Sequence, residues 1–136
     1  MIQRIQSVWF LVASAVAFLT LKLSFYSGTY LPDNLYHQLN GTENLILMAP
    51  TIALGIVTLI SIFLYKNRPT QLWLCAVALI IDLVLVFLYY RATKDFTQGD
   101  YAITAALHLL IIVSLALAFI GIKKDEKLIK DSNRFR

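Results

Sequence analysis

Two residues that can carry a proton or a charge, Asp82 and His108, interrupt long apolar stretches of this 136-residue chain. If these stretches are helices with a rise of 1.5 Å per residue, Asp82 lies roughly 16 Å and His108 roughly 20 Å from the membrane edge on the side of the chain termini. The two depths agree within about one helical turn, so the side chains can meet on adjacent helices. An intramembrane pair of this kind is either a proton or cation relay or an interhelical hydrogen bond. We favour the hydrogen bond, because transporters usually add broken helices, internal repeats or further polar groups, and the two halves show no convincing repeat.

The other residues that could do chemistry do not form a recognisable site. The sequence has no HExxH motif, no glycine-rich phosphate loop and no Ser-His-Asp set at a shared depth. Cys75 is the single cysteine, which excludes an intrachain disulfide and a cysteine-rich metal site. His37 stands alone in a polar connection. The sequence therefore predicts no enzymatic activity, no metal and no cofactor.

Four apolar runs must position Asp82 and His108. They cover residues 5–24, 44–65, 71–90 and 101–122, and each is long enough to cross the hydrocarbon layer as a helix. Helices satisfy their own backbone groups, which lipid cannot do. With 59% hydrophobic residues, the chain predicts one membrane domain over residues 1–136. The expected fold is an all-α membrane protein, a four-transmembrane-helix antiparallel bundle with a cytoplasmic amphipathic C-terminal extension.

The basic residues are distributed unevenly between the two sides of this bundle. Nine of the twelve lie at the N-terminus, in the second connection or in the tail: Arg4, Lys66, Arg68, Lys123, Lys124, Lys127, Lys130, Arg134 and Arg136. The opposite side has Lys22, Arg91 and Lys94. The positive-inside rule therefore predicts that both termini are cytoplasmic. Membrane flanking explains the net charge of +4 without a nucleic-acid partner.

The connections predict how the helices are arranged. The longest one, residues 26–43, places Leu35, Tyr36 and Leu39 on one helical face, so we expect a short helix on the membrane surface. The next two connections are short, which makes the second, third and fourth spans antiparallel neighbours. Closure of the bundle would bring the first span beside the fourth.

The tail, residues 123–136, continues the helical pattern of the last span. Leu128 and Phe135 are seven residues apart, and Glu126 precedes Lys130 by one turn as a favourable ion pair. Two destinations fit an amphipathic basic helix. Either the tail lies on the anionic leaflet of the membrane, or its apolar face binds a protein partner.

Both ends of the chain carry a resemblance. The opening MIQRIQSVWFLVAS and the closing GIKKDEKLIKDSNRFR resemble the two ends of an uncharacterised bacterial family, domain of unknown function four-two-nine-three. The resemblance implies a four-span inner-membrane protein of Gram-negative bacteria and no established activity. Asp82 and His108 are not part of the matching pattern. The terminal residues that we assign to contact between the ends or to partner binding are Arg4, Lys124, Asp125, Glu126, Leu128, Arg134 and Arg136, with Arg4 expected to pair with Asp125 or Glu126.

These observations favour a non-enzymatic accessory or scaffold subunit of a larger membrane assembly. Its partners would be membrane lipids and either another protein or a second copy of the chain. The alternative is a small proton- or cation-coupled transporter that acts as an oligomer through Asp82 and His108, since four spans enclose little space alone.

Overall fold

Four long helices run side by side in the computed structural model, which describes the backbone of residues 3–135 and the side chains of residues 5–135. They are α1 (Gln3–Lys22), α2 (Leu45–Phe63), α3 (Arg68–Ala92) and α4 (Thr104–Arg134). Each is long and apolar enough to cross a membrane. The four predicted helices are thus present, and the predicted continuation of the last span into the tail is confirmed, because α4 is a single helix to Arg134.

The bundle is held together by one inward-facing stripe on each helix, in which intervals of four and three residues alternate. On α3 the stripe consists of Gln71, Cys75, Ala78, Asp82, Leu85 and Tyr89. On α4 it consists of Thr104, His108, Ile111, Leu115, Ala118, Ile122 and Asp125. This spacing is typical of helices that pack with a small left-handed crossing angle. Helix α1 packs against α2 and α4, and α3 packs against the same two helices. The contacts of α3 confirm the prediction from the short connections, and the α1–α4 contact confirms the prediction from closure of the bundle.

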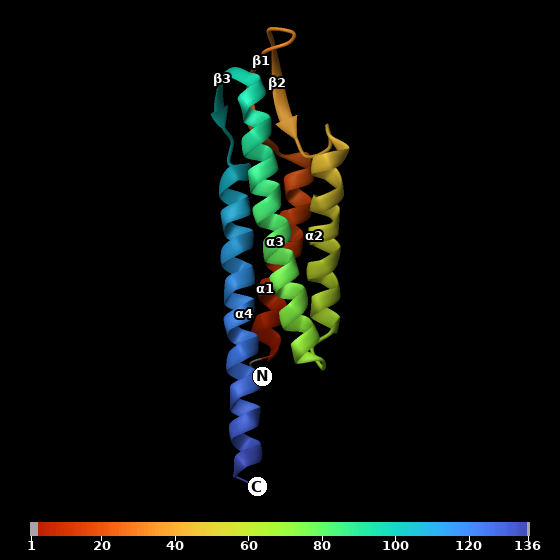
Figure 1. Ribbon diagram of the computed structural model, residues 1–136, viewed down its shortest axis with the longest axis vertical. Helices are drawn as coiled ribbons and strands as arrows, with labels where there is room; N and C mark the ends of the chain where they lie inside the picture. Colours follow the sequence, from red (N-terminus) through yellow and green to blue (C-terminus); the bar gives the residue numbers. More distant parts are fainter. Residues whose placement is uncertain (1–2, 136) are drawn as a thin grey trace.

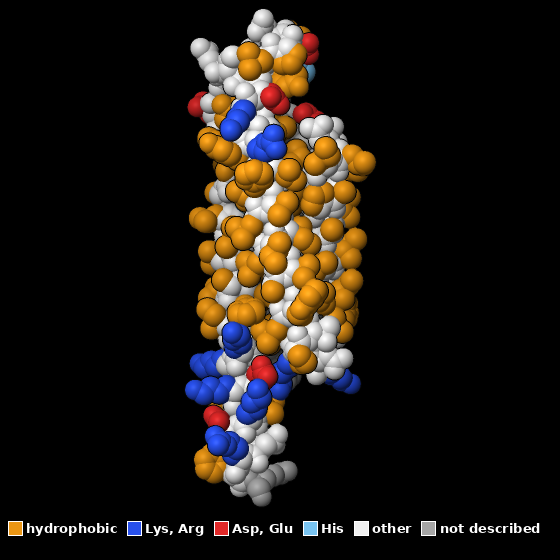
Figure 2. Space-filling model, in the orientation of Figure 1, with side chains coloured by type: hydrophobic (Ala, Val, Ile, Leu, Met, Phe, Trp, Pro, Cys, Tyr) orange, Lys and Arg blue, Asp and Glu red, His pale blue; other side chains and the backbone are white. Residues whose placement is uncertain are grey.

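The outer surface of the bundle is apolar. Large hydrophobic side chains such as Phe63, Trp73 and Leu109 are more than half exposed. Figure 2 shows a continuous hydrophobic band around the visible face, with charged side chains gathered beyond both of its ends. Water does not solvate such a band well, whereas the hydrocarbon layer of a membrane does. The structure is therefore that of a mostly helical protein with four helices able to span a membrane.

A three-stranded antiparallel sheet covers one end of the bundle, which we call the sheet end (Figure 1). The strands β1 (Ser24–Tyr30), β2 (Leu35–Asn40) and β3 (Phe96–Tyr101) lie in the order β2-β1-β3. Two predictions were therefore wrong: the fold is not all-α, and residues 35–40 form a strand instead of a surface helix. The hairpin turns at Asn34, whose φ of 52° is left-handed and suits asparagine. The short 3₁₀ helix η1 (Thr93–Asp95) leads from α3 into β3.

Two glycines allow β1 and β3 to approach closely. Gly28 and Gly99 lie opposite each other, and a Cβ on Gly28 would lie 2.1 Å from the Gln98 carbonyl oxygen. Replacing Gly28 with valine is expected to separate β3 from β1 while the four helices remain folded. Hydrogen exchange would then show rapid exchange of the β3 amides. Valine at the exposed Gln98 is the control, and retained protection of β3 in Gly28→Val would contradict the expectation.

Candidate functional site

The core polar pair of the bundle is Asp82 and His108. The Nδ1 atom of His108 lies 2.8 Å from Oδ1 of Asp82, and both side chains are almost completely buried. Each residue occupies an inward stripe position on its helix, and α3 and α4 are neighbours. The structure thus brings together the two residues whose depths agreed in the sequence.

Two aromatic rings enclose this pair toward the sheet end. The ring of Phe25 in β1 stacks on Tyr89 in α3 at a centroid distance of 4.4 Å. The His108 imidazole contacts both rings, at 5.9 Å from Phe25 and 5.4 Å from Tyr89. Phe25 is fixed because its carbonyl oxygen accepts a hydrogen bond from the Ala102 amide and the Thr104 hydroxyl donates to the Ser24 carbonyl oxygen. The sheet therefore supplies Phe25, one of the two rings that cover the pair, and α3 supplies the other.

The sequence did not single out Tyr89 or Phe25. Tyr89 lies near the end of a span, where tyrosines usually mark the membrane interface. Its side chain is instead fully buried in the core. One signal was available, since Tyr89 follows Asp82 by seven residues and so shares its face of α3. Phe25 had no such signal, because its position depends on the sheet.

Four buried side-chain polar atoms lack a hydrogen-bond partner within the described residues. They are Oδ2 of Asp82, Nε2 of His108, the Tyr89 hydroxyl and Oδ1 of Asn40. Thr51 lies near the Tyr89 hydroxyl, but its own hydroxyl donates to the Leu47 carbonyl oxygen. Buried polar atoms are normally paired, and an unpaired one costs free energy. Such a concentration marks this part of the core as a candidate site.

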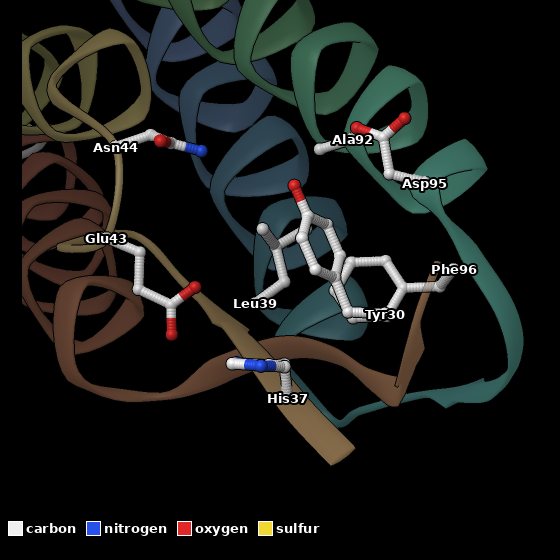
Figure 3. Close-up of a pocket in the computed structure, with 8 residues that line it drawn as sticks. All are labelled: Tyr30, His37, Leu39, Glu43, Asn44, Ala92, Asp95 and Phe96. Carbon is white, nitrogen blue, oxygen red and sulfur yellow. The ribbon is translucent and has the colours of Figure 1, made fainter. Parts of the chain in front are cut away.

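A cavity of about 250 Å³ opens near this cluster, between the sheet and the end of α3. Figure 3 shows Glu43 and Asn44 on one side, Ala92 and Asp95 on the other, and Tyr30 with its hydroxyl directed inward. The remaining lining residues are His37, Leu39 and Phe96. His37 is not isolated, because Asp33 lies 3.9 Å from its Nε2 atom. Within the described residues, no group of three or more His, Cys, Asp or Glu side chains could hold a metal ion.

A second polar contact joins the two ends of the chain at the opposite end of the bundle, which we call the tail end. Nε2 of Gln6 in α1 donates a hydrogen bond to Oδ2 of Asp125 in α4 at 2.5 Å. Both side chains are buried, and Gly121 leaves the space that the Gln6 side chain fills. Sequence reasoning missed Gln6. It proposed Arg4 as the partner of Asp125 or Glu126, and the Arg4 side chain lies outside the described residues.

A family model matches residues 2–135, nearly the whole chain. The chain belongs to the family Domain of unknown function (DUF4293). The resemblance of the two ends is thereby confirmed. No curated protein and no solved structure matches the chain.

The two terminal segments of this DUF4293 chain that resemble the family are in direct contact. Gln6 belongs to the opening segment and Asp125 to the closing one, and their hydrogen bond fastens α1 to α4. Both contribute buried side chains at a helix interface, where a hydrogen bond to a charged group is worth about 1.5–3 kcal/mol. The Asp82–His108 pair lies elsewhere in the bundle and shares no residue with this contact.

Beyond Asp125, α4 of this DUF4293 chain extends past the bundle (Figure 1). We call residues 123–134 the tail helix. The predicted pair within it is present, with Lys130 Nζ 3.0 Å from Glu126 Oε1. Lys124, Leu128 and Arg134 are exposed, whereas Asp125 is buried against α1. Arg136 lies outside the described residues.

Proposed function

We propose that this protein is a non-enzymatic accessory or scaffold subunit of a larger membrane assembly. The observation that carries the proposal is the tail helix, which leaves the bundle with apolar side chains on its surface. Leu128 is 49% exposed and Ile129 41%, and the adjoining Phe135 is 92% exposed. Within the described residues, nothing covers these side chains.

The position of Phe135 favours a protein partner over lipid. Residue 135 lies thirteen residues beyond Ile122, the last buried apolar residue of the stripe, which corresponds to about 20 Å of helix. Figure 1 shows α4 continuing along the bundle axis instead of folding back over the tail end. A bilayer that surrounds the hydrophobic band would leave Phe135 well outside the hydrocarbon layer.

The charges of the tail helix indicate what kind of partner would fit. Five basic side chains accompany its apolar ones: Lys123, Lys124, Lys127, Lys130 and Arg134. The half-buried Glu126 and the exposed Asp131 offset only part of this charge. A partner groove with an apolar floor and an acidic rim would match this helix in both respects.

The proposed location is the bacterial inner membrane, with the tail end in the cytoplasm. The support is the uneven distribution of lysine and arginine, because the tail end holds most of the basic residues of the sequence. Cysteine labelling from each side of the membrane, at Ser132→Cys in a Cys75→Ala background, tests the orientation.

The accessory role is tested on the tail helix itself. The variant Leu128→Ser/Ile129→Ser/Phe135→Ser is expected to reduce the apparent size of the protein in mild detergent to that of the isolated chain. Photocrosslinkers at Leu128 and Phe135 should capture one partner, whereas a crosslinker at the lipid-facing Leu109 should not. Asn133→Ser, at an exposed polar position to which no contact is assigned, is the control for the altered segment. An unchanged assembly in the triple variant would exclude the tail helix as the binding surface.

The Asp82–His108 contact supports a second candidate, a small proton- or cation-coupled transporter that acts as an oligomer. Purified protein in liposomes decides between the two roles. Ion flux that Asp82→Asn abolishes would establish transport. Absence of flux in preparations that still associate with a partner would leave the accessory role.

A further inference from the structure

The polar groups in the half of the core toward the tail end are all satisfied within the described residues. The hydroxyls of Thr58, Ser61 and Ser114 each donate to a carbonyl oxygen of their own helix. Gln71 donates to the Ser61 carbonyl oxygen, and the Cys75 thiol donates to that of Leu115. Between the Asp82–His108 pair and Asp125 at the tail end, this half of the core therefore offers no buried carboxyl or imidazole among the described residues that could receive a proton.

Apolar layers also close the core between the pair and the tail end. The inward positions there hold fully buried side chains from each of the four helices: Phe10, Ala13, Leu54, Cys75, Ala78, Ile111, Leu115 and Ala118. Protein interiors of this kind are close-packed and exclude water. Asp82 is thus the last carboxyl group on the inward stripe of α3 in that direction.

Toward the sheet end, by contrast, the core contains buried polar atoms that lack a hydrogen-bond partner within the described residues. The Nε2 atom of His108 lies on the opposite edge of the imidazole from Asp82, and the rings that contact the imidazole are Phe25 and Tyr89. Apart from Thr51, whose own hydroxyl donates to Leu47, the Tyr89 hydroxyl has no hydrogen-bond partner within the described residues. It faces the connection after β2, where a Cβ on Gly41 would lie 2.9 Å from it. Ala92, one turn beyond Tyr89 on α3, lines the cavity at the sheet end.

We propose that Asp82 and His108 form a proton-binding site that exchanges with the solution through Tyr89 at the sheet end and is sealed from the tail end. The pair is electrically neutral with two exchangeable protons and has a charge of −1 with one. We call the change from a charge of −1 to the neutral pair loading, and it takes up one proton from the sheet side. Unloading is the reverse change and releases the proton to the same side. No oxidant, metal or second substrate is needed.

The groups that face the pair leave its charge uncompensated. The aromatic rings of Phe25 and Tyr89 contact the His108 imidazole. The buried polar side chains on the sheet-end halves of the other helices are hydroxyls: Thr20 on α1, Thr51 on α2 and Thr104 on α4. Within the described residues, no lysine or arginine is buried. An uncompensated charge in this core is costly, so the neutral, loaded pair is the resting state and unloading weakens the α3–α4 contact. The site goes beyond the accessory role, because it makes the bundle responsive to acidity on one side of the membrane.

Nitrogen-15 NMR of labelled histidine tests the site. The chain has two histidines, so the variant His37→Asn in lipid nanodiscs leaves His108 as the single labelled residue. Its ring-nitrogen signals are expected to change between about pH 4 and pH 9, and the midpoint is expected to shift by at least about one pH unit in Asp82→Asn. Signals that stay constant over this range, or an identical midpoint in Asp82→Asn, would overturn the proposal. If Asp82→Asn does not fold, Tyr89→Phe provides the second variant.

Sealed liposomes test the sidedness. Protease added outside the liposomes cleaves the tail only where the tail end faces outward, so the uncleaved fraction is the fraction with the sheet end outside. Infrared spectroscopy then follows the Asp82 carboxyl band after a step in external pH. The responding fraction is expected to equal the sheet-end-out fraction, and an ionophore should then recruit the remainder. Tyr89→Phe is expected to slow the response by about tenfold or more, whereas Tyr90→Phe, on the exposed face of the same helix, should not. A response that follows the tail-end-out fraction, or an unchanged rate in Tyr89→Phe, would refute the one-sided route. Neither result depends on whether the tail helix binds a partner.

Discussion

Asp82→Leu is expected to lower the free energy of unfolding by about 3 kcal/mol. The substitution leaves the His108 imidazole, which is 1% exposed, without its 2.8 Å partner in the core. Removing one member of a buried charged pair typically costs about 3–5 kcal/mol, whereas interhelical hydrogen bonds in membranes average about 0.6 kcal/mol. Unfolding in mixed micelles by increasing SDS measures the difference. The neighbouring Leu83→Ala, on the exposed face of α3, is the control for altered side-chain size.

Two further variants separate loss of pairing from loss of packing. Asp82→Asn keeps an oxygen that can accept a hydrogen bond from Nδ1 of His108, so its cost is expected to stay at or below about 1 kcal/mol. The double variant Asp82→Leu/His108→Leu removes both partners and is expected to be more stable than either single variant. Strictly additive losses would show that the two side chains do not interact energetically.

The helices and the depth of the pair could be predicted because both follow from local rules. Apolar runs of membrane-spanning length must be helical, and a fixed rise per residue converts sequence position into depth. Asp82 and His108 were therefore placed at similar heights before their contact was observed. The continuation of α4 into the tail was also visible, because the apolar spacing continues through Leu128 and Phe135.

The sheet could not be predicted from the same rules. Strand β1 pairs with β3, and the partners Tyr26 and Tyr101 are separated by two complete helices in the sequence. The spacing of Leu35, Tyr36 and Leu39 suits a helical face, but pairing with β1 decides their conformation. Because Phe25 reaches the core only through this sheet, the aromatic cover of the site was hidden with it.

Gln6 was missed for a related reason. A glutamine near the start of a span resembles a solvated interface residue, and its burial depends on the approach of α4 at Gly121. The sequence pattern assigned Asp125 of the tail to a contact between the chain ends, but it considered only a basic partner and not an amide. Contacts between the chain ends depend on shape as well as on charge.

Gly121→Leu is expected to destabilise the tail end of the bundle by about 2–3 kcal/mol. A Cβ at position 121 would lie 3.1 Å from Cγ of Gln6, so the longer leucine side chain must displace the glutamine. Asp125, which is 6% exposed, then loses the donor to its carboxylate, and a hydrogen bond to a charged group is worth about 1.5–3 kcal/mol. SDS unfolding and hydrogen exchange of the first turns of α1 measure the loss. Ile120→Ala, on the exposed face of α4, is expected to be nearly neutral.

Further variants distinguish loss of the Gln6–Asp125 hydrogen bond in Gly121→Leu from simple overpacking at position 121. Gln6→Leu alone is expected to cost about as much as Gly121→Leu, because it also leaves the Asp125 carboxylate unpaired. Combining Gly121→Leu with Gln6→Leu should then add little, since the same hydrogen bond cannot be lost twice. Gln6→Leu with Asp125→Leu should recover part of the stability, because no buried carboxylate remains. If the Gly121→Leu and Gln6→Leu losses are fully additive, the glycine acts through packing alone, and the Gln6–Asp125 hydrogen bond does not explain why the two chain ends belong together.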